Sequence, residues 1–308
     1  MGARVVRGLT PLGELRLVGA GGEPVDLRRT LAAHGVATLP PQRLDEEAWT
    51  LETTLPVGRG RARTVSVRGG RHGYAAVELA GAASARDRER LLGTVRHILR
   101  LDDDLSAFYA VAAADDELAW AAAGAGRMLR SPSVFEDVVK TVCTTNCSWA
   151  LTTTMTTALV EHLGDPAPGG RRAFPSPEAM AANDESFFRE VVRSGYRAPY
   201  LRALAGSVAS GEVDLEALAD PELPDDEAEA RLLALPGVGP YGAAHVMLTS
   251  LGRYSRLVFD SWTRPTYARL AGRRAKDATI ERRFRRYGDW AGLAFWLYLT
   301  RSWVEETV

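Results

Sequence analysis

The chain has 308 residues, of which 46% are hydrophobic and 25% charged, with a formal net charge of -1 at pH 7. This balance is typical of a folded globular protein and excludes a disordered or fibrous one. The length predicts two domains, or one large helical body with a smaller sheet attached. Because the net charge is close to zero, a nucleic-acid surface requires charge to be segregated along the chain.

Three segments between residues 49 and 80 show the period-2 alternation that is typical of half-buried strands. The apolar or buried-face positions of these segments are Trp49, Leu51, Thr53, Leu55, Val65, Val67, Val77 and Leu79. Runs rich in Gly and Arg at 58–61 and 69–73 separate the segments as turns. We therefore predict a small antiparallel β domain within residues 1–110.

From about residue 86 the apolar spacing becomes helical, with breaks at 131–133, 164–170 and 220–226. The predicted fold class is therefore α+β: the N-terminal antiparallel β domain followed by an all-α domain over residues 111–308. No apolar run approaches the roughly 18 residues that a membrane span requires, so we expect a cytoplasmic protein without a membrane partner.

The chain has two cysteines, Cys143 and Cys147, which we expect on one helix because they lie four residues apart. Two cysteines exclude a disulfide framework and a four-cysteine iron–sulfur cluster. Without nearby His or acidic partners in the sequence they make a poor metal site. We expect buried thiols and no metal.

Charge is segregated in the second half of the chain. Residues 212–229 carry nine acids and no Lys or Arg, whereas residues 253–286 carry eleven Lys or Arg against three acids. We therefore expect a phosphate-facing surface in the second stretch.

Residues 225–252 predict two helices joined by a tight hairpin. An acidic helix beginning near Asp225 leads to the turn Pro236-Gly237-Val238-Gly239, and Pro240 fits the first position of the second helix. The bare glycines let a phosphate approach backbone N–H groups at that helix's N-terminus, so such a hairpin holds DNA without reading its sequence. A lone PGVG is more typical of a helix end followed by a proline start, but the residues that follow favour the hairpin.

Asp260 follows the second helix and the short apolar run 257–259. With the hairpin, this spacing resembles the HhH-GPD superfamily of DNA glycosylases, of the alkylpurine and 8-oxoguanine type. The resemblance implies that residues 111–308 are a helix-hairpin-helix glycosylase core. It also implies that Asp260 is the catalytic carboxylate, which stabilises an oxocarbenium-like sugar, helps a water attack C1′, or both. Asp260 is also expected to cap a helix that begins near Trp262.

Further segments, at 131–149, 171–181 and 194–201, resemble the 8-oxoguanine branch, and 39–55 with the sheet resembles the β domain that precedes the core. The resemblance implies that Asn146 enters the duplex near the estranged base. It implies that Tyr196 wedges into the base stack and that Arg197 contacts the orphaned partner base, roles that suit a gap left by an extruded base. The alternatives are a helix-interior asparagine and a loop tyrosine packed on the core.

The sequence departs from the 8-oxoguanine branch in the base pocket. Tyr241 stands where the bifunctional enzymes have a Schiff-base lysine, and the two lysines of the chain, Lys140 and Lys276, lie outside the hairpin. A covalent lyase mechanism therefore loses its nucleophile. The resemblance further assigns pocket positions to His245, Phe295 and Leu299. Four aromatic residues, if they are not core, offer faces for an electron-poor alkylated purine: Trp149, Trp262, Phe295 and Trp296.

The sequence thus predicts a monofunctional DNA glycosylase that flips out and hydrolytically excises a damaged purine, alkylated or oxidised, in base-excision repair. The alternative is a non-catalytic helix-hairpin-helix protein that binds distorted or abasic DNA. The expected partner is double-stranded DNA containing a damaged base, bound by a monomer at the nucleoid. No cofactor is expected, apart from a monovalent cation that the hairpin can hold when DNA is bound.

Overall fold

The computed structural model describes residues 8–305, and its N-terminal part is one antiparallel sheet in the order β1-β5-β4-β3-β2. The strands are β1 Leu9–Arg16, β2 Arg43–Asp45, β3 Thr50–Gly58, β4 Arg61–Gly69 and β5 Tyr74–Ala80. The three predicted strands are β3, β4 and β5, and both Gly/Arg-rich runs form the turns between them. The edge strands β1 and β2 were not predicted, because β1 buries only Leu12 and β2 has three residues, so neither alternates.

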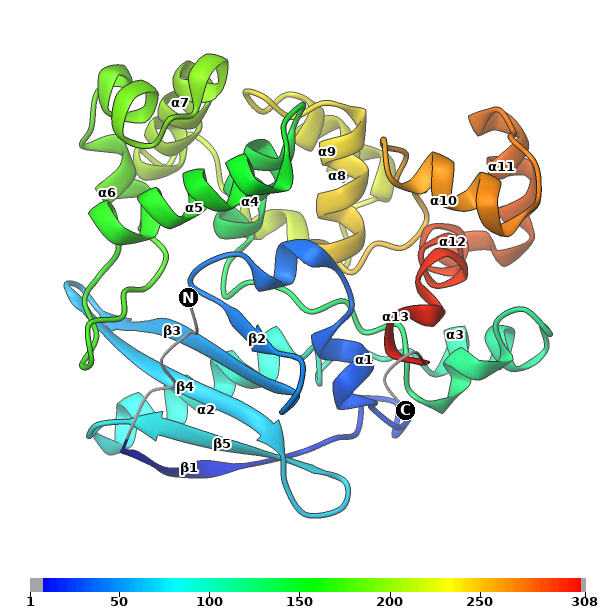
Figure 1. Cartoon of the computed structure of the whole chain (residues 1–308), viewed down its shortest axis with the longest axis horizontal. Helices are drawn as coiled ribbons and strands as arrows, with labels where there is room; N and C mark the ends of the chain where they lie inside the picture. The colour runs from blue at the N-terminus through cyan, green and yellow to red at the C-terminus, as the bar shows by residue number, and fades with distance from the viewer. Residues whose placement is uncertain (1–7, 306–308) are drawn as a thin grey trace.

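The chain after the sheet is helical, as predicted, and Figure 1 shows the sheet at one end of the molecule with most helices beyond it. The first helices are α1 Leu27–Leu31, α2 Ala85–Ile98, α3 Ser106–Ala113, α4 Val134–Thr144, α5 Trp149–Leu163, α6 Pro177–Ala181 and α7 Ala198–Ala209. The remaining ones are α8 Asp225–Leu233, α9 Pro240–Val246, α10 Thr263–Leu270, α11 Asp277–Phe284, α12 Ala291–Thr300 and α13 Ser302–Glu305. None of the helices in residues 8–305 is both long and apolar enough to cross a bilayer.

Three hydrophobic cores hold these elements together. One lies between the sheet and helices α1 and α2. A central core joins α4, α5 and α7 to the helix pair α8 and α9. A third core joins α3 to the C-terminal helices α10, α11 and α12. Side chains from distant parts of the chain, between residues 144 and 264, line a cleft near the central and third cores.

Buried polar contacts fix the sheet side of the molecule to the helices. Arg100 is buried, and its guanidinium donates to the carbonyls of Thr249 at 2.5 Å and Ser250 at 2.8 Å. These carbonyls lie in the π-helical segment η6 Met247–Leu251, which continues α9. Lys140 of α4 is also buried and donates to Gln42 at 2.5 Å. Arg100 therefore places its positive charge at the C-terminal end of α9 and its continuation η6, where it interacts favourably with the helix dipole.

The prediction that Cys143 and Cys147 share a helix is wrong. Helix α4 ends at Thr144, because Thr145 is extended and Asn146 has a positive φ of 45°. Cys147 therefore lies in the turn before α5, where its Sγ contacts the Cys143 carbonyl at 3.2 Å. Both thiols are free, and residues 8–305 contain no group of three or more His, Cys, Asp or Glu arranged to hold a metal.

The acidic and basic stretches partly neutralise each other. Arg253 pairs with Asp225 at 2.8 Å, and Arg256 pairs with Glu229 at 2.7 Å, so both arginines face the acidic helix α8. The phosphate-facing surface expected over 253–286 is therefore narrower than the sequence indicated. Within the described residues, six cations of this stretch have no ion pair: Arg269, Arg273, Arg274, Lys276, Arg282 and Arg285.

Candidate active site

The predicted hairpin between α8 and α9 is present. Helix α8 ends at Leu233, Gly239 is the N-cap of α9, and Pro240 occupies its first turn. Gly237 has a φ of 79°, and a Cβ at this position would lie 3.0 Å from the Tyr200 side chain. A Cβ on Gly239 would meet no atom within 4 Å, so the backbone there is open on its outer side. The turn thus presents backbone N–H groups at a helix N-terminus, an arrangement that binds anions.

Asp260 caps the next helix, as predicted. Its Oδ1 accepts hydrogen bonds from the backbone N–H groups of Trp262 at 2.8 Å and Thr263 at 2.6 Å, and the Thr263 hydroxyl accepts from the Asp260 N–H at 2.8 Å. This reciprocal cap fixes the carboxylate at the positive end of α10. Within residues 8–305 both hydrogen bonds to the carboxylate fall on Oδ1. Its Oδ2 therefore accepts no hydrogen bond from these residues.

The hairpin and Asp260 line the same cleft, which has a volume of about 930 Å³. This size is within the range of sites that bury a small molecule or a single base. The predicted site residues that line it are Asn146, Tyr196, Gly237, Val238, Gly239, Tyr241 and Asp260. These residues come from the loop after α4, the start of α7, the hairpin and the α10 cap. Four segments that are far apart in sequence therefore build one site between the central and third cores.

Nine residues that line the cleft were not predicted as site residues, among them Thr144, Tyr200 and Arg264. The Thr144 hydroxyl lies 3.2 Å from the Tyr241 hydroxyl. Tyr200 is 39% exposed, and its ring lies 6.3 Å from that of Tyr196, edge to face. The i, i+4 spacing of the two tyrosines at a helix start was a signal for this pair.

Several predicted residues lie outside the cleft. Pro236 lines a different surface hollow, on the other side of the hairpin. Trp149 is 49% exposed, and its ring packs over the backbone of Gly35. Arg197 is 3% exposed and donates to Thr145 rather than facing the cleft. The DNA contacts predicted for Pro236 and Arg197 and the pocket position predicted for Trp149 therefore stay predictions.

The remaining predicted pocket residues lie behind the cleft wall. His245 is buried, with its ring 5.7 Å from that of Tyr241. Phe295 and Leu299 are buried in the third core, and Phe295 packs 5.5 Å from the cleft residue Phe259. The last predicted position, Trp262, packs 5.7 Å from Trp296 and 5.4 Å from Trp303. His245, Phe295 and Leu299 are therefore packed core behind the site, whereas Trp262 is 37% exposed and does not line the cleft.

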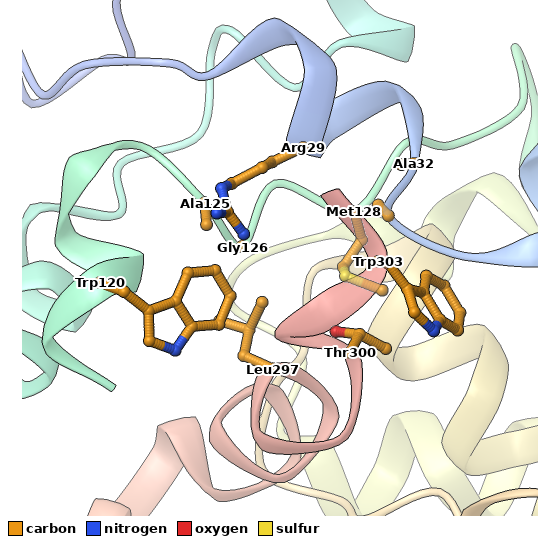
Figure 2. Close-up of a pocket in the computed structure, with 10 residues that line it drawn as sticks. Arg29, Ala32, Trp120, Ala125, Gly126, Met128, Leu297, Thr300 and Trp303 are labelled. Carbon is orange, nitrogen blue, oxygen red and sulfur yellow. The ribbon is translucent and has the colours of Figure 1, made fainter. Parts of the chain in front are cut away.

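A further hollow, shown in Figure 2, is too small to hold a base. It lies between α1, the segment at 120–128 and the C-terminal helices, with Trp120, Leu297, Thr300 and Trp303 around it. Arg29 covers the Trp120 ring at 4.4 Å. The hollow has a volume of about 20 Å³, which is enough for a single water. The cleft at Asp260 is large enough for a base and is the one that the hairpin turn and Asp260 line together.

Two buried histidines stand behind Tyr241 and are neutral in the folded protein. Burial lowers the pKa of His34 to about 4 and the pKa of His245 to about 3, from the usual 6.5. The two rings lie 5.8 Å apart, and His34 Nε2 lies 2.6 Å from the Leu129 carbonyl. These two side chains therefore carry no charge at neutral pH.

We expect this histidine pair to make folding sensitive to acid. In the unfolded chain both side chains protonate near pH 6.5, so the unfolded state binds more protons below that pH and stability falls from about pH 6.5 towards the folded pKa values of about 4 and 3. Each histidine should lower the free energy of unfolding by about 2 kcal/mol between about pH 7.5 and about pH 5. Urea denaturation at both pH values checks this expectation. His34→Gln should reduce the loss in free energy of unfolding between the two pH values, and His72→Gln, at an exposed position, should not. An equal loss in wild type and His34→Gln would contradict it.

The fold and the cleft together define a helix-hairpin-helix protein with a carboxylate beside the hairpin. Residues 139–291, about half of the chain, match the family described as HhH-GPD superfamily base excision DNA repair protein. The chain therefore contains an HhH-GPD domain, as its sequence indicated, and this domain carries the hairpin, Asp260 and every other residue that lines the cleft.

Two relatives with different named activities match part of this chain. The chain is 34% identical over 142 residues to an N-glycosylase/DNA lyase of Arabidopsis thaliana, covering 44% of this chain and 38% of that protein. It is 27% identical over 169 residues to a DNA-3-methyladenine glycosylase of Bacillus subtilis (strain 168), covering 53% of this chain and 55% of that protein. The matches thus span less than two thirds of either relative.

The fold extends beyond these matched segments. The structure is similar to that of a 3-methyladenine DNA glycosylase from Archaeoglobus fulgidus, with a TM-score of 0.71 and 21% identity, covering 95% of this chain and 99% of that chain. This similarity includes the N-terminal sheet. The predicted α+β fold class is thereby confirmed.

Proposed function

We propose that this protein is a DNA glycosylase that removes a damaged purine, alkylated or oxidised, from double-stranded DNA in base-excision repair. The observation that carries the proposal is that Asp260 and the hairpin turn line one cleft large enough for a single base. The hairpin N–H groups suit a DNA phosphate, and the cleft beside them suits a nucleotide turned out of the duplex. The named activities of the relatives support the same proposal.

The reaction proposed is hydrolysis at C1′ of the sugar. A water oxygen bonds to C1′ and loses a proton as the C1′–N9 bond breaks, and the base leaves with the bonding electrons. An uncharged base takes up a proton as it leaves, whereas a purine made cationic by alkylation leaves as a neutral base and the proton from water goes to solvent. Positive charge develops on the sugar in between. The Asp260 carboxylate, fixed through Oδ1 by two backbone N–H groups, stabilises that charge through Oδ2 and orients the water.

The absence of a cleft lysine supports a reaction that stops at the abasic site. Tyr241 lines the cleft where a lyase needs an amine, and burial raises the pKa of its phenol, which keeps it neutral. Lys140 is buried and pairs with Glu136 at 2.6 Å, and exposed Lys276 is the N-cap of α11, outside the cleft lining. No Schiff base with the sugar is therefore expected.

The lesion can be identified by the bases that the protein releases. Genomic DNA treated separately with a methylating agent and with an oxidant is incubated with the protein, and the freed bases are identified by mass spectrometry. We expect at least one modified purine in free form from one of the two DNAs, and none with Asp260→Asn. Binding to both DNAs without any release would instead favour the non-catalytic binder of distorted or abasic DNA.

A further inference from the structure

The guanidinium of Arg197 is buried and makes hydrogen bonds inside the protein from all three of its nitrogens. The side chain is 3% exposed and donates from Nη2 to the Thr145 carbonyl, from Nε to the Thr145 hydroxyl at 3.2 Å, and from Nη1 to the Ser194 carbonyl at 3.5 Å. Its carbon Cζ lies 4.4 Å from the centre of the Tyr196 ring. A planar cation held by three hydrogen bonds and one aromatic face has little left to offer a DNA base.

The residues that Arg197 holds are the exposed ones. Tyr196 is 50% exposed, and its hydroxyl lies 3.4 Å from both the Thr145 carbonyl and the Asn146 amide nitrogen. Asn146 is exposed and has a φ of 45°, an unusual conformation that neighbouring contacts must support. Arg197 therefore joins the turn after α4 to the start of α7 and fixes two side chains at the rim of the cleft.

We infer that Arg197 is a positioning residue for Tyr196 and Asn146, and that the protein does not discriminate the base opposite the lesion. The inference rests on the proposed function, in which a flipped base leaves an orphaned partner beside these residues. The two exposed side chains that Arg197 holds, Tyr196 and Asn146, are both uncharged. A tyrosine ring stacks on any base, and an amide supplies both donors and an acceptor, so it can serve all four.

A stable abasic analogue tests this inference without knowledge of the lesion. Duplexes carrying a tetrahydrofuran abasic analogue opposite C, T, A or G are titrated with the protein, and affinity is measured by fluorescence anisotropy. Direct readout of one base by a bidentate arginine would give about 5- to 150-fold discrimination. We expect the four dissociation constants to lie within about threefold of one another, and a preference of tenfold or more would overturn the inference.

Variants separate positioning from base contact. Arg197→Lys keeps the charge but loses the planar fork, and Arg197→Met loses both; each should weaken binding to all four duplexes by the same factor. Thr145→Val removes one hydrogen-bond partner and leaves Arg197 in place, so it should give a smaller effect of the same pattern. A change in the ratios among the four duplexes in either Arg197 variant would make Arg197 a base-contacting residue.

The outcomes also separate this inference from the proposed function. If the Arg197 variants do not fold, wild type and Thr145→Val still decide the matter, because both retain the guanidinium. Absence of base release with uniform binding of the four duplexes opposes the glycosylase alone. Base release together with strong opposite-base preference opposes only the positioning role, and failure to bind any abasic duplex opposes both.

Discussion

Asp260→Asn is expected to slow base excision by at least about 100-fold, the loss seen when one group that stabilises developing charge is removed. Affinity for DNA should change little. An asparagine accepts the two backbone hydrogen bonds that Asp260 Oδ1 receives from Trp262 and Thr263, and it caps helices as well as aspartate does. The substitution therefore removes charge while it keeps the local structure.

Single-turnover excision and equilibrium binding, measured on the same duplex, check this expectation. Asp277→Asn is the matched control, because Asp277 is a nearby carboxylate that pairs with the cleft residue Arg264 at 2.8 Å and does not line the cleft. It should leave excision within a few-fold of wild type. Near-normal excision by Asp260→Asn would remove Asp260 from the catalytic role.

Gly237→Ala should weaken binding to duplex DNA by about 10- to 100-fold. Gly237 has a φ of 79°, and a methyl group would press on Tyr200 at 3.0 Å. Strain of this kind costs about 1–3 kcal/mol. We expect the free turn to relax away from it, so that DNA binding must restore the strained geometry; each 1.4 kcal/mol corresponds to a tenfold change in affinity.

Gly211→Ala separates backbone strain from DNA contact. Gly211 has a φ of 78°, but a Cβ there would meet no atom within 4 Å, and it does not line the cleft. Its alanine variant should lose stability and keep its DNA affinity. Equal affinities for wild type and Gly237→Ala would show that the hairpin does not approach DNA closely.

Sequence reasoning predicted the hairpin and the Asp260 cap because both depend on local rules. A proline at the first turn of a helix, glycines in a tight turn and an aspartate before a helix each have one dominant physical reason. Only some of the residues that line the cleft were predicted from the sequence. Asn146, Tyr196 and Tyr241 were found through resemblance, whereas Thr144 and Arg264 join the cleft through packing between segments that no local pattern connects.

The errors have similar causes. Cysteine spacing predicted one helix, but the positive φ of Asn146 ends α4 before Cys147, and asparagine tolerates this conformation where most residues do not. The charge pattern predicted a phosphate-facing surface within 253–286, and two of its cations, Arg253 and Arg256, instead pair with the acidic helix α8. Pairing across the fold cannot be inferred from composition along the chain.

The most direct test of the account is a denaturing gel of a lesion-bearing duplex, run with and without alkali after incubation with wild-type protein and with borohydride present in a parallel reaction. The lesion is the modified purine identified by base release. The account predicts strand breaks only after alkali, no trapped protein–DNA adduct, and neither product with Asp260→Asn, because water displaces the base and no amine reaches C1′. Alkali-independent cleavage with a trapped adduct on wild-type protein would contradict it.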